Sequence, residues 1–475
     1  MSQSTDAAAL PAEPSEVDAA QPTPGGSWEL LRLAAPLIVS QSFMTVQVFV
    51  DTILLAHHDS LEMTASFPAV MWFWLPFGLL QVTAGYTSTF VAQYTGAGRS
   101  YRVGPAVWQG IHFAMIAGLA FMLMAPAASF LISLGDHTPA LQALEAAYLR
   151  CLAFAALPML IMAAINGFFA GRGQTWTVLG IEAVGTAVNV ALALLWIFGH
   201  GGFPEMGIEG AGWATVAGSW ASALTALVLF LGPSYREEFN TAGGWMPESD
   251  LFWRLMRYGG PAGSQMFLDV LVFHLFTQMV GQLGEAELGA TTLTVRLNMV
   301  AFLPMMGLGQ AICILVGQRL GADQPDLAEK SAYTGLYWVF GYMCAIAAMY
   351  VTIPNLLVAM FESDRNPAQF QAVAEIVPTL LICVAIFSLA DAVNVAFAFA
   401  LRGAGDTWFV SLLTFTLAWP IMVVPTYLVV HYGGSVYWAW VFATAHIIAM
   451  AVCFYLRFRT GRWKEMRVIE PAVVE

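Results

Sequence analysis

Residues 91–97 have the sequence VAQYTGA, and residues 316–322 have the closely related sequence VGQRLGA. Four of the seven positions are identical, and the two stretches lie 225 positions apart (316 minus 91). A second pair agrees at nearly the same spacing, because RGQTW at 172–176 resembles RGAGDTW at 402–408. These matches predict that the chain is an internal duplication, with two halves of similar structure.

Long apolar segments fill both halves, from Trp28 to Phe458. Each is at least about 20 residues long, the length that an α-helix needs to cross a bilayer. We expect twelve spans, at residues 28–56, 65–94, 103–133, 141–170, 174–199, 208–233, 250–283, 288–318, 328–361, 371–401, 408–431 and 436–458. Six spans per half is an even number, so both halves begin on the same side of the membrane. The sequence therefore predicts an all-α integral membrane protein with twelve transmembrane helices in two parallel-repeat six-helix lobes, an architecture that secondary transporters use.

The composition supports a membrane protein and argues against several other classes. The chain is 59% hydrophobic and only 10% charged, whereas soluble domains have about 25% charged residues. Its net charge of −13 argues against nucleic acid as a partner. No metalloprotease, serine-hydrolase or nucleotide-binding motif occurs, so we expect no enzyme activity, no bound cofactor and no ATP-driven transport. Membrane lipids are the expected surroundings, and we expect a monomer.

Basic residues indicate the orientation, because they concentrate in the cytoplasmic loops of membrane proteins. Arg99 follows the second expected span, Arg172 the fourth, Arg319 the eighth and Arg402 the tenth, whereas the opposite connections hold only Arg365. Both termini are therefore expected in the cytoplasm. The predicted units are a disordered cytoplasmic tail at 1–27, a first lobe at 28–233, a cytoplasmic linker at 234–249, a second lobe at 250–458 and a cytoplasmic tail at 459–475.

Polar side chains within the apolar spans of the second half are candidate functional residues, because charges at the bilayer centre are costly and seldom retained without a role. Asp269 and Asp391 each lie roughly 16 to 18 Å along their helix from a presumed cytoplasmic arginine, at 1.5 Å per residue. Gln265 and Asn394 lie one turn away on the same helix faces. Two carboxylates with nearby amide oxygens suit a sodium ion, or a proton shared by the pair.

The first half has a similar cluster at its own depth. Asp51 has Gln47 one turn before it, and Asn189 has Glu182 two turns before it on the same face of a helix. Asp51 and Asn189 both lie roughly 26 to 28 Å along their helices from the cytoplasmic end. For all these residues the ordinary alternative is a hydrogen bond that joins neighbouring helices.

Several stretches together resemble the multidrug and toxic compound extrusion (MATE) family. They are Phe49–Ile53, Val91–Arg99, Gly210–Ala214, Pro261–Asp269 and Asp391–Gly403. The resemblance implies a V-shaped pair of six-helix lobes that exports small organic cations in exchange for Na⁺ or H⁺ by alternating access, in a bacterial inner membrane. The alternative is a flippase for lipids or lipid-linked oligosaccharides, which a related superfamily builds on a similar scaffold.

The resemblance also bears on individual residues. Asp391 matches the acidic residue of the family's tenth span, while Asp269 stands where a glutamate is usual. Asp51 and Asn189 match positions that some members use to bind a proton, but Ala193 replaces a second acid of the fifth span. The resemblance therefore leaves Na⁺ and H⁺ open as coupling ions, with Asp269 and Asp391 as the site where Na⁺ would bind if it is the coupling ion.

Overall fold

The computed structural model describes residues 24–135, 137–361 and 367–471. Most of the expected N-terminal tail, the end of the expected C-terminal tail and Arg365 therefore lie outside the described residues. Within them, all the regular secondary structure is helical.

The first lobe is built from the helices before residue 233 and contains the first six spans. Its elements are α1 (Ser27–His58), α2 (Ser60–Gly85), α3 (Thr87–Gly96), η2 (Ser100–Arg102), α4 (Val103–Met122), η3 (Ala125–Ala127), α5 (Ala128–Ile132), α6 (Pro139–Gly171), α7 (Thr175–Ile197), η4 (His200–Gly202) and α8 (Gly207–Phe230). The short helix α9 (Pro233–Arg236) follows in the linker. The second span runs from α2 into α3, and the third from η2 through α4 to α5.

The second lobe repeats this pattern. Its elements are α10 (Ser249–Gly281), α11 (Glu285–Gly321), α12 (Pro325–Thr352), α13 (Pro354–Ala359), α14 (Pro367–Ala404), α15 (Thr407–Ala418), the π-helical segment η5 (Trp419–Val423), α16 (Val424–His431), α17 (Val436–Arg459) and η6 (Arg462–Glu465). The eleventh span consists of α15, η5 and α16 in succession.

The span count follows from helix length and hydropathy. Eleven helical stretches of the described chain are long and apolar enough to cross a membrane. The 33-residue helix α10 completes the set, and its lower hydropathy reflects Asp250, Arg254 and Arg257 in its first turns together with Asp269. The predicted fold class, two lobes of six membrane helices each, is confirmed.

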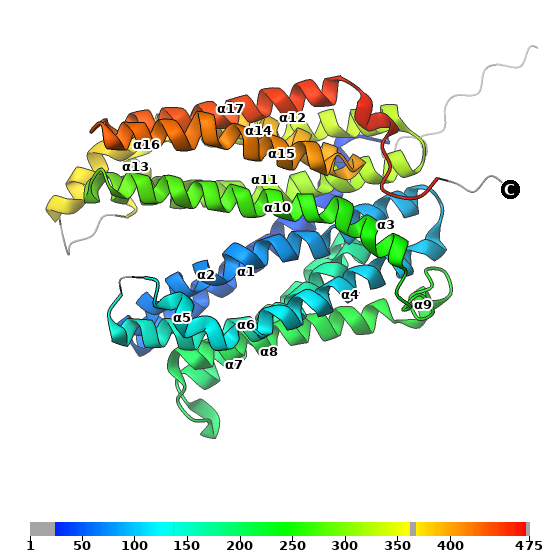
Figure 1. The fold of residues 1–475 in the computed structure, drawn as a ribbon, viewed down its shortest axis with the longest axis horizontal. Helices are drawn as coiled ribbons and strands as arrows, with labels where there is room; N and C mark the ends of the chain where they lie inside the picture. The colour runs from blue at the N-terminus through cyan, green and yellow to red at the C-terminus, as the bar shows by residue number, and fades with distance from the viewer. Residues whose placement is uncertain (1–23, 136, 362–366, 472–475) are drawn as a thin grey trace, which may run out of the picture.

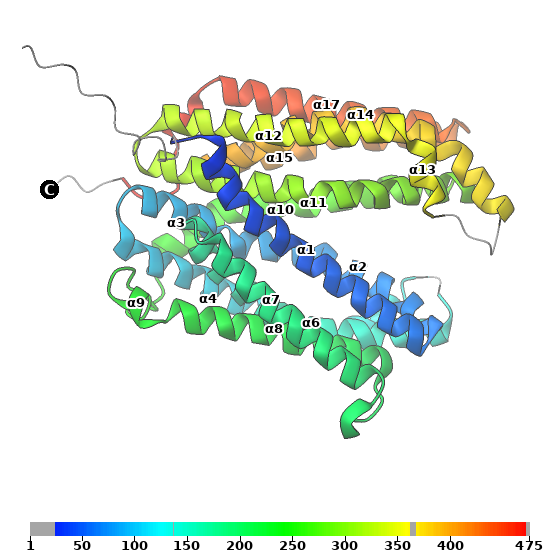
Figure 2. The ribbon, with the colours of Figure 1, turned by 180° about the vertical axis from the view of Figure 1, so that it is seen from behind.

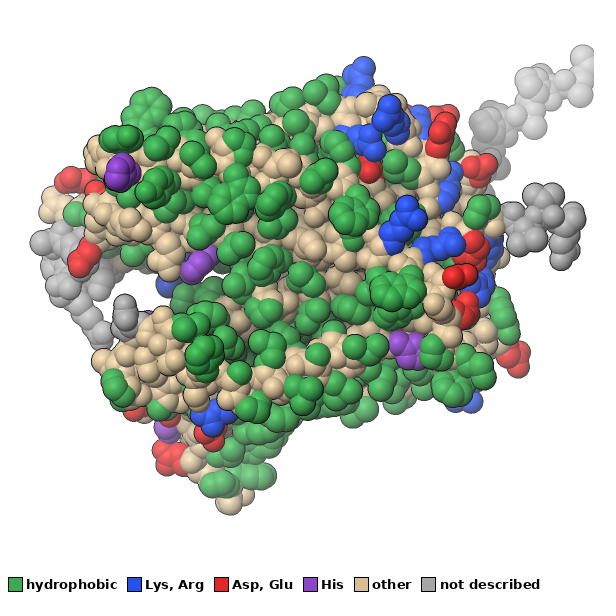
Figure 3. Space-filling view, in the orientation of Figure 1, with side chains coloured by type: hydrophobic (Ala, Val, Ile, Leu, Met, Phe, Trp, Pro, Cys, Tyr) green, Lys and Arg blue, Asp and Glu red, His purple; other side chains and the backbone are tan. Residues whose placement is uncertain are grey.

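The two lobes form two layers that meet at one end of the molecule and diverge at the other (Figures 1 and 2). Where they meet, α1 and α3 contact α11, and α2 contacts α10. The space-filling view shows the molecule hollowed between the lobes at the opposite end (Figure 3). Lys and Arg side chains gather at the end where the lobes meet, and the chain's described N- and C-terminal residues lie there too.

The duplicated motif lies at the seam between the lobes and packs against its own copy. A Cβ atom added to Gly96 would lie 1.9 Å from the carbonyl oxygen of Gln318, and one added to Gly321 would lie 2.1 Å from that of Gln93. The side chains also reach across: Gln93 donates to the Gly403 carbonyl at 2.9 Å, and Gln318 donates to the Gly171 carbonyl at 2.8 Å. The repeat therefore predicts the contact that joins the two lobes, because glycine permits this close backbone approach.

Candidate cation sites

The tenth span contributes a buried carboxylate. Asp391 on α14 is 6% exposed, and the amide nitrogen Nδ2 of Asn394 donates to its Oδ1 at 3.0 Å. One turn earlier, the hydroxyl of Ser388 donates to Oδ1 of Asn298 on α11 at 3.3 Å. Ser388, Asp391 and Asn394 are spaced three residues apart, so they share one face of α14. The side-chain amide oxygen of Asn394 is buried and has no partner among the described residues.

The seventh span places a second carboxylate near the first. Asp269 on α10 is exposed to solvent, whereas Gln265, one turn before it, is only 5% exposed. Asp269 lies close enough to Asp391 and to Arg402 to interact electrostatically with each of them. The structure thus brings together the two acids that the sequence singled out.

Arg402 corrects one part of the sequence interpretation. Its spacing suggested an arginine in a cytoplasmic connection, but it lies in the last turn of α14, within the protein. Its guanidinium donates to Oε1 of Gln265 at 2.7 Å and lies 5.0 Å from the centre of the Phe399 ring. Its carbonyl accepts a hydrogen bond from the Tyr86 hydroxyl of the first lobe at 2.7 Å. Arg402 is therefore an internal positive charge beside the acid pair and part of the contact between the lobes.

Sequence reasoning missed Arg402, Asn298 and Ser388 as members of this cluster. A signal for Arg402 was present, because eleven residues separate it from Asp391, about three helical turns, which puts both on one face. Asn298 has a weaker signal, a lone amide in an apolar span, and only the packing of α11 against α14 shows its partner. Carboxylate, amide and hydroxyl oxygens are the ligands that hard cations prefer. Among the described residues, no three His, Cys, Asp or Glu side chains gather as a transition-metal site would require.

The first lobe holds a separate polar cluster. Asp51 on α1 is 6% exposed, and Asn189 on α7, close to its carboxyl group, is fully buried. Asn189 donates through Nδ2 to the Thr215 hydroxyl on α8 at 3.3 Å. Oδ1 of Asp51 and Oδ1 of Asn189 have no hydrogen-bond partner among the described residues. The predicted pair is thus brought together, with buried oxygens available to a proton or cation.

The two supporting residues of the first lobe differ from this pair. Glu182 accepts a hydrogen bond from Nδ2 of Asn166 on α6 at 3.0 Å, so a different helix holds it. Gln47 is half-buried on α1, one turn before Asp51. Glu182 therefore forms its own pair, although helical spacing puts it on the same face of α7 as Asn189.

An apolar cavity of about 210 Å³ lies between the lobes. Trp72, Pro76 and Phe121 of the first lobe line it, together with Met124 and with Phe267 from α10 of the second lobe. Phe267 lies two residues before Asp269. Aromatic faces and flexible methionine side chains are suited to organic cations of varied shape.

The duplicated helical lobes, the central polar clusters and the hollow between the lobes define the chain as a two-lobed membrane transporter. Its fold is that of solved transporters of this architecture. A MOP superfamily transporter from Pyrococcus furiosus superimposes with a TM-score of 0.82 at 19% identity, over 93% of this chain and 97% of that one. An outward-facing multidrug resistance MATE family transporter of the MOP superfamily gives 0.83 at 18% identity, with the same coverage.

The sequence comparison identifies the family. The MatE family model matches residues 36–195 and 261–428, one stretch in each lobe, and the chain belongs to this family. A multidrug resistance protein NorM from Aliivibrio fischeri is 29% identical over 398 residues, covering 82% of this chain and 84% of the relative. A probable multidrug resistance protein NorM from Shewanella oneidensis is 25% identical over 451 residues, covering 90% and 94%. The protein is therefore a multi-pass transport protein of the membrane and not an enzyme.

Proposed function

We propose that the protein is a secondary antiporter that exports small organic cations in exchange for an inward-moving ion, Na⁺ or H⁺. The observation that carries the proposal is the acid pair Asp269 and Asp391, which lies within the second lobe beside amide oxygens and a single arginine. One bound cation neutralises one carboxylate, so ion binding changes the net charge of this cluster in the second lobe. The names of the relatives as multidrug resistance proteins support the substrate class.

The location of the sites fits alternating access. In this structure the lobes meet at the end rich in Lys and Arg, and the hollow opens at the other end (Figure 3). Basic residues mark the cytoplasmic side of membrane proteins. We therefore assign the conformation as outward-open in a bacterial inner membrane, with both termini in the cytoplasm. An ion entering from outside reaches Asp269, and a drug leaves through the same opening.

The energetics are sufficient for export. A positive charge that moves inward across the membrane gains about 2.3 kcal/mol per 100 mV. That energy corresponds to a concentration ratio of about fiftyfold for each net positive charge that moves inward. A one-for-one exchange with a monovalent organic cation moves no net charge and is driven by the ion's own concentration gradient, whereas two ions exchanged for one such substrate also use the membrane potential. The apolar cavity beside Phe267 would hold the organic part of such a substrate while its positive charge faces the acid pair.

The test is efflux of a fluorescent organic cation from proteoliposomes, driven separately by a sodium gradient and by a proton gradient. Asp391→Asn should abolish efflux driven by the coupling ion, because the neutral amide can neither take up and release a proton nor offer a negative charge to Na⁺. Asp250→Asn is the matched control, since Asp250 is an exposed acid in the first turn of α10. If neither gradient drives any organic cation, the antiporter proposal fails and the flippase alternative, which the relatives' names do not support, becomes the hypothesis to test with labelled lipids.

A further inference from the structure

The segment after the last membrane helix does not leave the protein at once. α17 ends at Arg459, and the chain turns at Gly461, which has a φ of 73° that favours glycine. It then forms η6 (Arg462–Glu465) and continues to Glu470 across the end where the lobes meet. We call residues 462–470 the strap.

The first part of the strap is fixed to the second lobe. Trp463 is 1% exposed and stacks on Phe458 with ring centres 4.5 Å apart, and its Nε1 donates to the Phe458 carbonyl at 2.8 Å. Lys464 forms ion pairs with Asp326 at 2.9 Å and with Glu329 at 2.6 Å, both on α12. The hydrogen bonds that Lys464 donates to Glu329 and Asp326 raise its pKa, so it stays charged. This anchor combines a buried aromatic ring with surface ion pairs.

The second part of the strap packs mainly on the first lobe. Val468 is fully buried and Ile469 is 7% exposed, and both belong to an apolar core formed mainly by α3, α4 and α6, to which α10 of the second lobe also contributes. The backbone N–H of Val468 donates to Oε1 of Gln93 at 2.8 Å. Gln93 is the residue whose amide also reaches the Gly403 carbonyl in the second lobe. The strap is therefore bonded to the contact that joins the two copies of the repeat.

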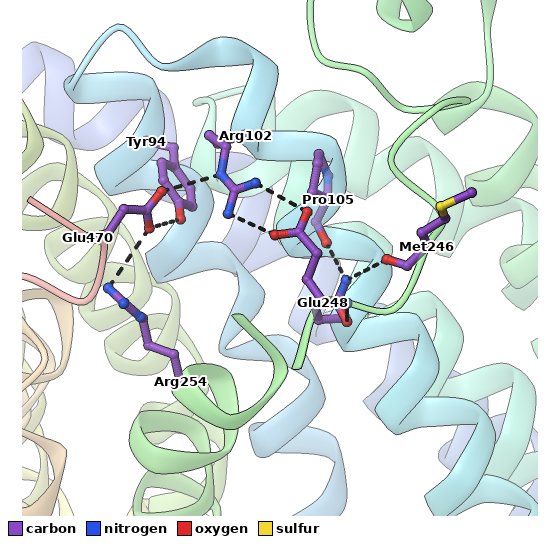
Figure 4. Close-up of polar contacts among 8 residues, drawn as sticks. Tyr94, Arg102, Pro105, Met246, Glu248, Arg254 and Glu470 are labelled. Atoms are coloured by element: carbon purple, nitrogen blue, oxygen red, sulfur yellow. Dashed lines mark hydrogen bonds and ion pairs between the residues drawn. The ribbon is translucent and has the colours of Figure 1, made fainter. Parts of the chain in front are cut away.

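Glu470 completes the attachment (Figure 4). Its carboxylate accepts a hydrogen bond from the Tyr94 hydroxyl at 2.6 Å and one from Nε of Arg102 at 3.3 Å. On the other side it lies 3.8 Å from the guanidinium of Arg254, on α10 of the second lobe. Its backbone carbonyl accepts a further hydrogen bond from Arg99 at 2.8 Å. One carboxylate thus faces cationic groups from both lobes.

Two observations indicate that this contact is ionic. Burial tends to raise the pKa of Glu470, but hydrogen bonds from Tyr94 and the charges of Arg102 and Arg254 outweigh it, so the pKa is below the usual range and the group is ionised at neutral pH. Arg102 also binds Glu248 through two parallel hydrogen bonds of 3.1 and 2.9 Å. Such two-pronged contacts between arginine and carboxylate fix geometry as well as charge.

We propose that the strap is a latch that holds the cytoplasmic ends of the lobes together in the outward-open conformation and must release before the transporter opens inward. Inward opening separates the lobes at this end. A segment buried against both lobes cannot keep all its contacts when they separate. The second-lobe anchor combines the packed ring of Trp463 with the ion pairs of Lys464, whereas Glu470 itself contacts both lobes only through charges and hydrogen bonds, so we infer that the Glu470 contacts are the ones that release.

The experiment measures the distance between the cytoplasmic ends without any substrate. Spin labels are placed at Ser234 on α9, directly after the last helix of the first lobe, and at Lys330 on α12 of the second lobe, both of which are exposed. Distances are measured by pulsed electron resonance in nanodiscs. Glu470→Gln keeps the shape of the side chain and removes its charge. Glu465→Gln is the matched control, because Glu465 is exposed in the same segment and forms no ion pair among the described residues.

We expect Glu470→Gln to raise the ratio of inward-open to outward-open molecules about five- to tenfold, in the range of coupling that such contacts provide. Raising the salt concentration should shift the wild type in the same direction and should shift Glu470→Gln less, because salt screens ionic contacts and this variant has already lost one of them. Equal distance distributions for Glu470→Gln and Glu465→Gln would overturn the latch.

A second variant keeps the test valid if Glu470→Gln proves unstable. Arg254→Gln removes only the positive charge contributed by the second lobe, at the longest of these contacts. It should give a shift in the same direction but smaller, and combining it with Glu470→Gln should add nothing further, because both act on one contact. Additive shifts would contradict the proposal. The latch rests on the outward-open conformation proposed above, but the measurement needs no transported cation, so a failure of the latch is distinguishable from a failure of the antiporter proposal.

Discussion

The two lobes derive from one duplicated sequence, yet their polar clusters differ in charge and accessibility. The first-lobe cluster has one buried acid, Asp51, beside the neutral partners Asn189 and Thr215. The second-lobe cluster has two acids and an arginine, and one of the acids, Asp269, is exposed to solvent. Two carboxylates with amide oxygens suit a metal cation, whereas a single buried carboxylate suits a proton. The two lobes share one helical fold because of the duplication, but different polar residues in their spans make the two sites chemically different.

Replacing Asp391 should have the largest effect. Asp391→Asn keeps an oxygen that can accept from Asn394 but removes the negative charge beside Asp269. Removing one partner of a buried ionic cluster costs about 3 to 5 kcal/mol, so ion-driven efflux should fall at least about a hundredfold. Efflux from proteoliposomes under each gradient measures the loss. Efflux close to wild type would show that the second lobe does not carry the coupling ion.

Replacing Asp51 tests the other side of the comparison. Asp51→Asn removes a buried acid that has only neutral partners, and such a change is worth about 1.5 to 3 kcal/mol. We expect proton-driven efflux to fall about tenfold or more and to lose its dependence on external pH, while sodium-driven efflux changes less. The same vesicles, assayed between pH 6 and pH 8, separate these outcomes. Equal losses under both gradients would mean that the two clusters act as one site.

The sequence predicted the fold and the acids more completely than it predicted their partners. Hydropathy and the repeat gave the two lobes, because burying apolar helices in lipid depends on composition and length alone. Helical spacing gave the pairs Asp391 with Asn394 and Gln265 with Asp269, because three or four residues always define one face. It could not assign Glu182, which Asn166 binds from another helix. Contacts between helices depend on how the helices pack, and the spacing of residues along one helix does not reveal which other helix lies against it.

Arg402 is a second residue whose surroundings could not be predicted from its position in the sequence. An arginine near the end of a span normally reaches the membrane surface, and the sequence interpretation therefore treated it as an orientation marker. In the structure Gln265 and Phe399 hold its guanidinium inside. The contact with Gln265 arises only because α10 and α14 belong to one lobe and converge there.

Arg402 also provides the third prediction. Its positive charge competes with any cation that binds the acid pair, so Arg402→Gln should tighten sodium binding about five- to tenfold, the size of a partly screened charge interaction. Sodium-dependent protection against thermal unfolding measures the affinity. Gln318→Ala is a useful control for loss of a lobe contact, because Gln318 bonds the Gly171 carbonyl and no acid. Unchanged or weaker sodium binding would show that the Arg402 guanidinium does not repel the bound ion.

The smallest effect is expected at Glu182. Its carboxylate accepts a hydrogen bond from Asn166, and among the described residues no hydrogen bond or ion pair joins it to Asp51 in the same lobe. Glu182→Gln keeps a hydrogen-bond acceptor at that position, so we expect efflux within about twofold of wild type under both gradients and a loss of about 1 kcal/mol in stability. Efflux and the thermal unfolding midpoint are measured on the same preparation. A loss as large as that of Asp51→Asn would join Glu182 to the proton site, and the first lobe would then hold an acid pair as the second does.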